Sequence, residues 1–255
     1  MTATPAGISY ADYLKLDRVL TAQQPLSGLH DEMLFIIIHQ TKELWMKQML
    51  HELELAIPLV GADSFAAAYK ALARISRIQS VMTLSWEVLS TLTPVDYLAF
   101  RHVLGTSSGF QSAQFREFEF RLGLKDPVYL QHHAEGSEDR RHLESALEQP
   151  SLRDASHAAL ERAGFDLGDR SVDAAAAAWL QVYRDSERWF DLYQLAEKLV
   201  DLDDALAAWR HKHVLTVERI IGNKTGTGGS AGASYLRSTV DKRIFPELWA
   251  LRTDL

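Results

Sequence analysis

Apolar residues recur at helical spacing over most of this chain of 255 residues, and this periodicity constrains its fold more than any other feature. Acidic residues open the segment from Asp31 to Ile57 and Pro58 follows it, so the pattern predicts an amphipathic helix over 31–57 that stops at Pro58. Its apolar positions, three, four or seven residues apart, include Leu34, Phe35, Ile38, Trp45, Met49, Leu50 and Leu53. No stretch alternates convincingly with a period of two, so we expect an all-α fold.

Capping signals predict further helices. One is expected over about 64–92 with Asp63 as its cap, and "TPVD" places Thr93 as cap and Pro94 at the first helical position of a short helix that stops near Gly105. Glycine and proline break residues 123–171 into short pieces, which we interpret as a variable excursion. A long apolar pattern then runs from Ala174 to Gly222. The length favours one domain over 1–255.

The charge and residue composition exclude several classes of function. The net charge is −7 with lysine and arginine scattered among acids, which argues against nucleic acid or an anionic membrane as partner. The chain has no cysteine, so it can form no disulfide, thiolate metal site or thiol nucleophile. No apolar run reaches about 18 residues and no signal peptide opens the sequence. We therefore expect a cytoplasmic protein.

His213 is the first candidate for chemistry. It follows Leu202, Leu206 and Trp209 at steps of four, three and four, so its imidazole faces the same way as a core-facing stripe. A lone histidine in such a place is more often a core residue bonded to a backbone carbonyl. The alternative is an axial ligand of haem iron, which needs a single imidazole. His211 cannot join it in a zinc site, because side chains two apart on a helix point to nearly opposite sides.

His39 is the second candidate. It lies four residues after Phe35 in the apolar stretch "LFIIIHQ", so both side chains project from one helical face. Taken alone, His39 also fits a core residue. The following residues, "HQTKE", lack the second histidine of the HExxH motif, so zinc-protease chemistry is excluded.

Tyr97 and Arg101 form a third candidate pair, one helical turn apart. An arginine beside an aromatic ring is usually a solvated surface charge. Here "GTSSGFQS" follows, whose backbone N–H groups and hydroxyls can meet an anion, and arginine binds carboxylates through two parallel hydrogen bonds. The glycine run at 222–232 lacks the order of a phosphate-binding loop. It offers backbone freedom to close over a ligand and present Thr227.

Four segments together resemble the tryptophan 2,3-dioxygenase family, haem enzymes that open the indole ring of L-tryptophan. They are "YADYLKLDRVL", "HDEMLFIIIHQTKELWMKQMLHEL", "DYLAFRHVLGTSSGFQSAQFR" and "DLDDALAAWRHKHVLTVERIIGNKTGTGGSAGASYLRSTV". The resemblance implies a helical-bundle subunit whose long amphipathic helices enclose a pocket for haem b. It also implies reaction of L-tryptophan with O2 to give N-formyl-L-kynurenine, the first step of tryptophan catabolism by the kynurenine route.

The resemblance also implies roles for the residues of the cofactor and indole sites. His213 resembles the proximal ligand of the haem iron, one turn after Trp209, and Ser108 resembles a residue close to the haem edge. His39 resembles the distal histidine beside the indole N–H, and Phe35 resembles a residue that lines the apolar pocket.

A second group of residues resembles the part of the family site that binds the amino-acid end of tryptophan. Arg101 resembles the residue that clamps the carboxylate, with Tyr97 beside it, and Thr227 resembles the loop residue that contacts the ammonium and carboxylate groups. Tyr10 and Tyr13 resemble residues that reach into a neighbouring subunit, which implies a homotetramer.

Three alternatives stay open from the sequence. One keeps the haem and fold but inserts a single oxygen atom or uses a modified tryptophan in a biosynthetic pathway. Another is a haem-binding sensor or carrier without turnover, which would not need Arg101 and Thr227. The last is a helical scaffold without a cofactor.

Overall fold

The computed structural model describes residues 7–255, and within that range it is helical with no strand, which confirms the predicted all-α fold. Its α-helices are α1 (Tyr10–Leu14), α2 (Leu16–Val19), α3 (His30–Gly61), α4 (Phe65–Leu89), α5 (Pro94–Phe100), α6 (Ala113–Leu122), α7 (Glu138–Glu148), α8 (Leu152–Arg162), α9 (Val172–Arg184), α10 (Phe190–Ile221), α11 (Ala233–Val240) and α12 (Pro246–Ala250). Four short 3-10 helices complete the order: η1 (Arg101–Leu104), η2 (Gly109–Gln111), η3 (Pro127–His132) and η4 (Leu251–Thr253).

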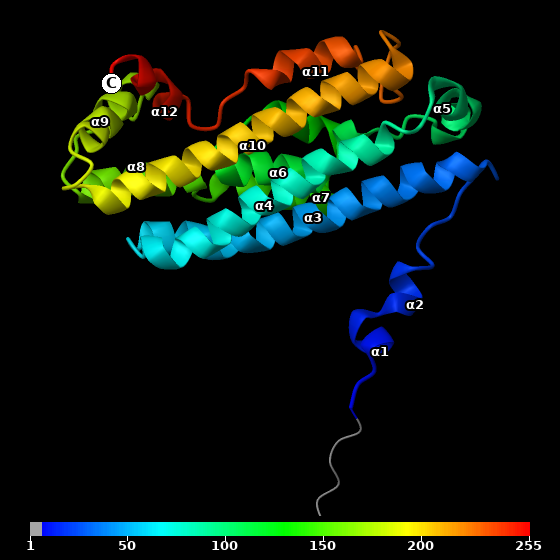
Figure 1. Ribbon diagram of the computed structural model, residues 1–255, viewed down its shortest axis with the longest axis horizontal. Helices are drawn as coiled ribbons and strands as arrows, with labels where there is room; N and C mark the ends of the chain where they lie inside the picture. Colours follow the sequence, from blue (N-terminus) through cyan, green and yellow to red (C-terminus); the bar gives the residue numbers. More distant parts are fainter. Residues whose placement is uncertain (1–6) are drawn as a thin grey trace, which may run out of the picture.

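The three longest helices form the body of the molecule. Figure 1 shows α3, α4 and α10 side by side, with α3 running opposite to α4 and α10. Their apolar stripes meet in one core, where Leu53, Ile75 and Leu199 are fully buried. Each such side chain contributes about 1.5–3 kcal/mol through removal from water, so this core stabilises the arrangement of the three helices.

Two helix boundaries differ from the predictions. Pro58 does not end α3, which continues to Gly61, because a proline in the last turn removes only one hydrogen bond near the helix end. Asp63 is not the cap of α4. It has a positive φ of 54° and its carboxylate pairs with Arg162, which leaves Ser64 as the residue before the helix.

The long apolar pattern from Ala174 to Gly222 is divided between two helices. Helix α9 ends at Arg184 and α10 begins at Phe190, and both pack on the same core, so the apolar spacing continues across the break. Trp189 at the junction packs against Phe165, with ring centroids 5.0 Å apart. The stretch 123–171 contains η3, α7 and α8, and α8 packs against α3. This stretch therefore forms part of the packed body.

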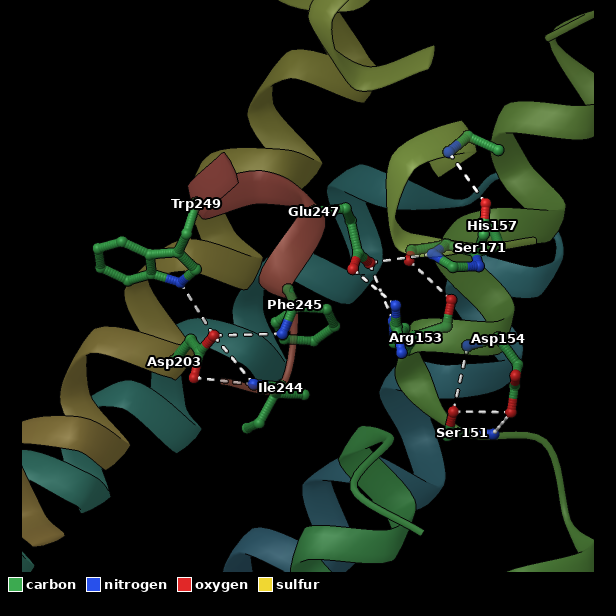
Figure 2. Close-up of polar contacts among 12 residues, drawn as sticks. Ser151, Arg153, Asp154, His157, Ser171, Asp203, Ile244, Phe245, Glu247 and Trp249 are labelled. Carbon is green, nitrogen blue, oxygen red and sulfur yellow. Dashed lines mark hydrogen bonds and ion pairs between the residues drawn. The ribbon is translucent and has the colours of Figure 1, made fainter. Parts of the chain in front are cut away.

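Two buried carboxylates hold the last residues against the bundle (Figure 2). Asp203 of α10 accepts hydrogen bonds from the backbone N–H groups of Ile244 and Phe245 at 3.1 and 3.2 Å, and from the indole N–H of Trp249 at 2.9 Å. Glu247 is fully buried and pairs with Arg153 at 2.8 Å.

His157 of α8 also reaches Glu247, with its Nε2 atom 3.0 Å from the carboxylate. These partners hold the pKa of Glu247 below its usual value in spite of burial. The C-terminal segment is thereby fixed to both α8 and α10.

The first helices stand away from this body (Figure 1). Tyr10 and Tyr13 of α1 are 76% and 73% exposed, and no side chain of α1 or α2 is buried. Over residues 7–255, none of the helices combines the length and apolar character needed to cross a membrane.

Candidate functional site

A cavity of about 680 Å³ opens between α3, α6, α10 and the glycine run. Seven of the residues singled out from the sequence line it: Phe35, His39, Tyr97, Ser108, Trp209, His213 and Thr227. These residues come from five separate parts of the chain, so the fold brings them together. The lining is mostly apolar, which suits a flat hydrophobic ligand.

His213 reaches the cavity from the apolar stripe of α10. Its ring stacks on the indole of Trp86 with a centroid distance of 4.3 Å and an interplanar angle of 10°, and it lies 5.5 Å from the ring of Trp209. Neither ring nitrogen has a hydrogen-bond partner within residues 7–255, so His213 is not the carbonyl-bonded core histidine considered above. Burial lowers its pKa to about 3, so the imidazole is neutral at physiological pH. A neutral imidazole is the form that binds a metal ion.

His39 faces the cavity from α3. Its Nδ1 atom lies 2.7 Å from the backbone carbonyl of Phe35, four residues earlier, and the two rings are 4.2 Å apart. Burial lowers the pKa of His39 to about 4, so the ring is neutral. Because a carbonyl only accepts, Nδ1 carries the proton and Nε2 is an acceptor. The cavity therefore contains an imidazole that can receive a hydrogen bond from a ligand N–H group.

Aromatic rings form one wall of the cavity. Helix α5 begins as predicted, with the Thr93 hydroxyl accepting from the N–H of Asp96, and it carries Tyr97 toward α3. The ring of Phe35 lies 5.9 Å from that of Tyr97 and 5.7 Å from that of Phe100. This cluster gives an apolar surface on which an aromatic ligand can stack.

Arg101 lies at the edge of the site. Its Nη2 atom donates to the carbonyl of Thr225, so it links η1 to the glycine run. Arg101 does not line the main cavity. It lines a neighbouring hollow together with Lys224, and Thr227 borders both.

The glycine run closes against the loop that precedes α6. The hydroxyl of Thr227 donates to the carbonyl of Ser107. A Cβ atom at Gly228 would lie 2.7 Å from the Cβ of Ser108, so only glycine permits this close approach. The two loops therefore form one edge of the cavity opening. A loop that folds over a ligand would have to lie at this edge.

Two cavity-lining arginines were missed by the sequence analysis. Arg116 and Arg210 are buried, and both bond to the carboxylate of Glu119 at 2.6 Å. Arg210 also donates to the carbonyl of Lys242, whereas Nε of Arg116 has no partner within the described range. Two arginines on one carboxylate leave a net positive charge. The only sequence signal was the spacing of three between Arg116 and Glu119, which is also typical of surface pairs.

Lys42 is the other group that the sequence analysis missed. It lines the cavity one turn after His39, is only 4% exposed, and its Nζ atom lies 2.8 Å from the ring centroid of Trp86. Within residues 7–255 no atom accepts a hydrogen bond from this ammonium. Burial lowers the pKa of Lys42 to about 6. Lysine is seldom fully buried unless it is paired, so sequence reasoning places such a residue on the surface.

The tyrosines of α1 are not brought to the site. Tyr10 and Tyr13 line neither the cavity nor the neighbouring hollow of the same chain. For residues 7–255, no three side chains from histidine, aspartate and glutamate converge in a way that would hold a metal ion.

The fold is all-α, and its cavity brings two neutral imidazoles and several aromatic rings together, a lining that suits a flat apolar ligand. A family model described as Tryptophan 2,3-dioxygenase matches residues 1–173 and 166–255. The chain belongs to the tryptophan 2,3-dioxygenase family.

Individual relatives agree with this assignment. A tryptophan 2,3-dioxygenase of Caulobacter vibrioides is 59% identical over 97% of this chain and 98% of its own length. Enzymes with the same name from a Polaromonas species and from Bacillus thuringiensis subsp. konkukian are 53% and 50% identical, each over 97% of this chain. These matches cover 88% and 93% of the relatives' lengths, respectively.

Proposed function

We propose that this protein is a haem-dependent dioxygenase that cleaves the C2–C3 bond of the indole of L-tryptophan with O2 and yields N-formyl-L-kynurenine. The observation that carries the proposal is the cavity in which His213 and His39, both neutral, meet an aromatic wall. The names of the relatives given above supply the substrate and the reaction class.

The cavity fits haem b in its size and in its donor atoms. Its volume of about 680 Å³ and apolar lining suit a flat macrocycle, and His213 is a neutral imidazole to which residues 7–255 offer no hydrogen-bond partner. One such imidazole is the protein ligand that haem iron requires, because the porphyrin supplies the others. We assign His213 as the iron ligand, with Trp209 packed beside it, and Ser108, which lines the same cavity, would contact the edge of the haem.

The buried arginines fit the two carboxylates of haem. Among residues 7–255, Nε of Arg116 has no hydrogen-bond partner, and the two positive charges of Arg116 and Arg210 exceed the single negative charge of Glu119. Uncompensated positive charge in a buried place favours an anionic partner. Arg116 is therefore the residue that we assign to a haem carboxylate.

When bound, haem iron supplies the site of O2 activation, and the protein's own residues position the substrate. The aromatic wall of Phe35 and Tyr97 stacks the indole and excludes water. The Nε2 atom of His39 accepts a hydrogen bond from the indole N–H and fixes the ring orientation. His39 therefore orients the substrate and need not remove the proton of the indole nitrogen before the reaction with O2.

The amino-acid end of tryptophan is assigned to the edge of the cavity. Arg101, in the hollow that shares Thr227 with the cavity, binds the carboxylate through paired donors. Thr227 contacts the ammonium and carboxylate groups. Binding by Arg101 requires its guanidinium to exchange the carbonyl of Thr225 for the ligand.

Several further assignments extend from the family. We propose that Tyr10 and Tyr13 complete the site of a neighbouring subunit, since they are exposed and lie away from the cavity of their own chain. This arrangement would require a homo-oligomer, which we expect to be a homotetramer. We also propose one domain over 1–255 and a cytoplasmic location.

The proposal is tested by expressing the protein in haem-sufficient cells and incubating it with tryptophan and 18O-labelled O2. A Soret band in the purified protein and a product with two labelled oxygen atoms are the expected results. A product with one labelled atom would indicate a monooxygenase, and turnover only of a modified tryptophan would move the enzyme to a biosynthetic role. A Soret band without any product would indicate a sensor or carrier.

A further inference from the structure

Lys42, Trp86 and His213 form a three-layer stack beside the cavity. The Nζ atom of Lys42 lies 2.8 Å from the centroid of the Trp86 ring, and the imidazole of His213 lies 4.3 Å from the same centroid at an angle of 10°. A parallel imidazole at this distance leaves no room for an ammonium group on the same face. The indole of Trp86 therefore separates Lys42 from His213.

No carboxylate in the described part of the chain neutralises the charge of Lys42. Within residues 7–255, Nζ makes no ion pair and no hydrogen bond, and its nearest described partner is the electron-rich face of the indole. Burial lowers the pKa of Lys42 to about 6, whereas contact with an aromatic face favours the ammonium form. The second effect opposes the first, so at pH 6 at least half of the Lys42 side chains are charged.

This ammonium is close enough to His213 to act on it. Nζ and the imidazole are roughly 7 Å apart through the stack, a distance at which an unscreened charge still interacts strongly in a protein interior. Lys42 thus disfavours any gain of positive charge at His213 or at an atom bound to it.

We propose that Lys42 is a positioning residue that acts through Trp86 and His213 to favour the ferrous over the ferric state of the haem iron. This inference rests on the proposed function, in which His213 is the iron ligand. Oxidation to ferric iron adds one positive charge beside the stack, and a fixed ammonium opposes that change. The ferrous state is the one that binds O2, so Lys42 would hold the enzyme ready for its second substrate.

The test is a spectroelectrochemical titration of the haem-loaded protein at pH 6 in four forms: wild type, Lys42→Met, Lys42→Arg and Lys47→Met. Lys47 lies on the exposed side of the same helix, so Lys47→Met removes an equal charge without touching the stack. At one fixed potential, Lys42→Met should lower the ferrous-to-ferric ratio about tenfold, which corresponds to about 59 mV for one electron. Lys42→Arg and Lys47→Met should stay within about twofold of wild type.

A second pair of variants separates this role from simple packing. Replacing Trp86 with Leu removes the surface that holds Nζ, so Lys42→Met should change the ratio much less in the Trp86→Leu background than in wild type. An equal change in both backgrounds would overturn the role of Trp86 in the proposal. If the ferrous-to-ferric ratio of wild type equals that of Lys42→Met and differs from that of Lys42→Arg, Lys42 is uncharged in the protein. This result would overturn the proposal.

The outcomes also separate this inference from the proposed function. Absence of a Soret band in wild-type protein expressed with ample haem would overturn both. Normal haem binding and tryptophan turnover, with ferrous-to-ferric ratios that do not respond to Lys42→Met, would overturn the role of Lys42 alone.

Discussion

The Nδ1 atom of His39 lies 2.7 Å from the carbonyl oxygen of Phe35, one turn earlier in α3. This bond fixes the tautomer of a neutral ring and leaves Nε2 as an acceptor on a residue that lines the cavity. It also ties the orientation of the imidazole to the helix that carries it. The geometry thus fits a residue that positions the indole.

From this relationship we expect His39→Ser to retain turnover of tryptophan at about one tenth of the wild-type rate, because one net hydrogen bond is worth on the order of 1 kcal/mol. Steady-state kinetics with tryptophan and with N1-methyltryptophan provide the measurement. The methyl group should cost wild type more activity than it costs the variant, which already lacks the bond. A completely inactive variant that still binds haem and tryptophan would make His39 an essential base, since a general base contributes about 100-fold to 10,000-fold.

Replacing His213 with Ala should remove or severely weaken haem binding, because the cavity would lose its only assigned iron ligand. Exposed His211, two residues away on α10, provides the matched control, and His211→Ala should bind haem normally. The Soret absorbance per mole of purified protein reports the difference. Equal haem content in the two variants would refute the assignment of His213.

Arg101→Ala should weaken tryptophan binding about 30-fold or more, because removal of a charged partner of a buried charge costs roughly 2–5 kcal/mol. Tryptamine, which lacks the carboxylate, should lose much less affinity. Equilibrium titrations of both ligands against wild type and variant would measure the effect. A uniform loss for the two ligands would mean that Arg101 is structural and acts through its bond to the glycine run.

The pKa of His39 predicts a loss of stability in acid. Burial lowers it from 6.5 to about 4, so in that pH window the unfolded chain binds a proton that the folded chain does not. Stability from this source is intact above pH 6.5 and falls as the pH falls toward 4. Between about pH 7.5 and 5, the unfolding free energy of wild type should fall by about 2 kcal/mol more than that of His39→Gln. Urea unfolding at both pH values measures this, and equal losses would contradict it.

Glu247→Ala should destabilise the protein by about 3 kcal/mol, because it leaves Arg153 and His157 without their buried partner. Denaturant unfolding at neutral pH is the appropriate measurement, with exposed Glu187→Ala as control for the loss of an acidic charge. A change below about 0.5 kcal/mol, the range of an ordinary surface substitution, would show that the buried pair does not hold the C-terminal segment.

The sequence predicts helices well where the signal is local. Thr93 and Pro94 start α5 as expected, because a cap hydroxyl and the next turn make a complete unit. Asp63 has the residue type of a cap, yet its carboxylate pairs with Arg162, a partner 99 residues away that no local pattern reveals. The break between α9 and α10 was missed because the apolar residues of both helices face the same core and continue the same helical spacing.

For the site, helical spacing put His39 and Phe35 on one face and His213 on an apolar stripe, while their meeting in one cavity depends on the packing of α3 and α10. From the sequence, only the resemblance to a family indicated that these residues share one site. Lys42 and Arg116 were missed for a different reason. Their burial depends on tertiary contacts with Trp86 and Glu119, and a cation on a helix is otherwise a surface residue.

The anchoring of the C-terminal segment has a consequence for biosynthesis. A chain can begin to fold while the ribosome is still adding residues. Asp203 is fully buried, and its partners Ile244, Phe245 and Trp249 follow it by 41, 42 and 46 positions. Until those residues leave the ribosome, α10 would carry a charge that burial makes costly. The helix that bears His213 therefore gains these hydrogen bonds only after residues 244–249 have been synthesised.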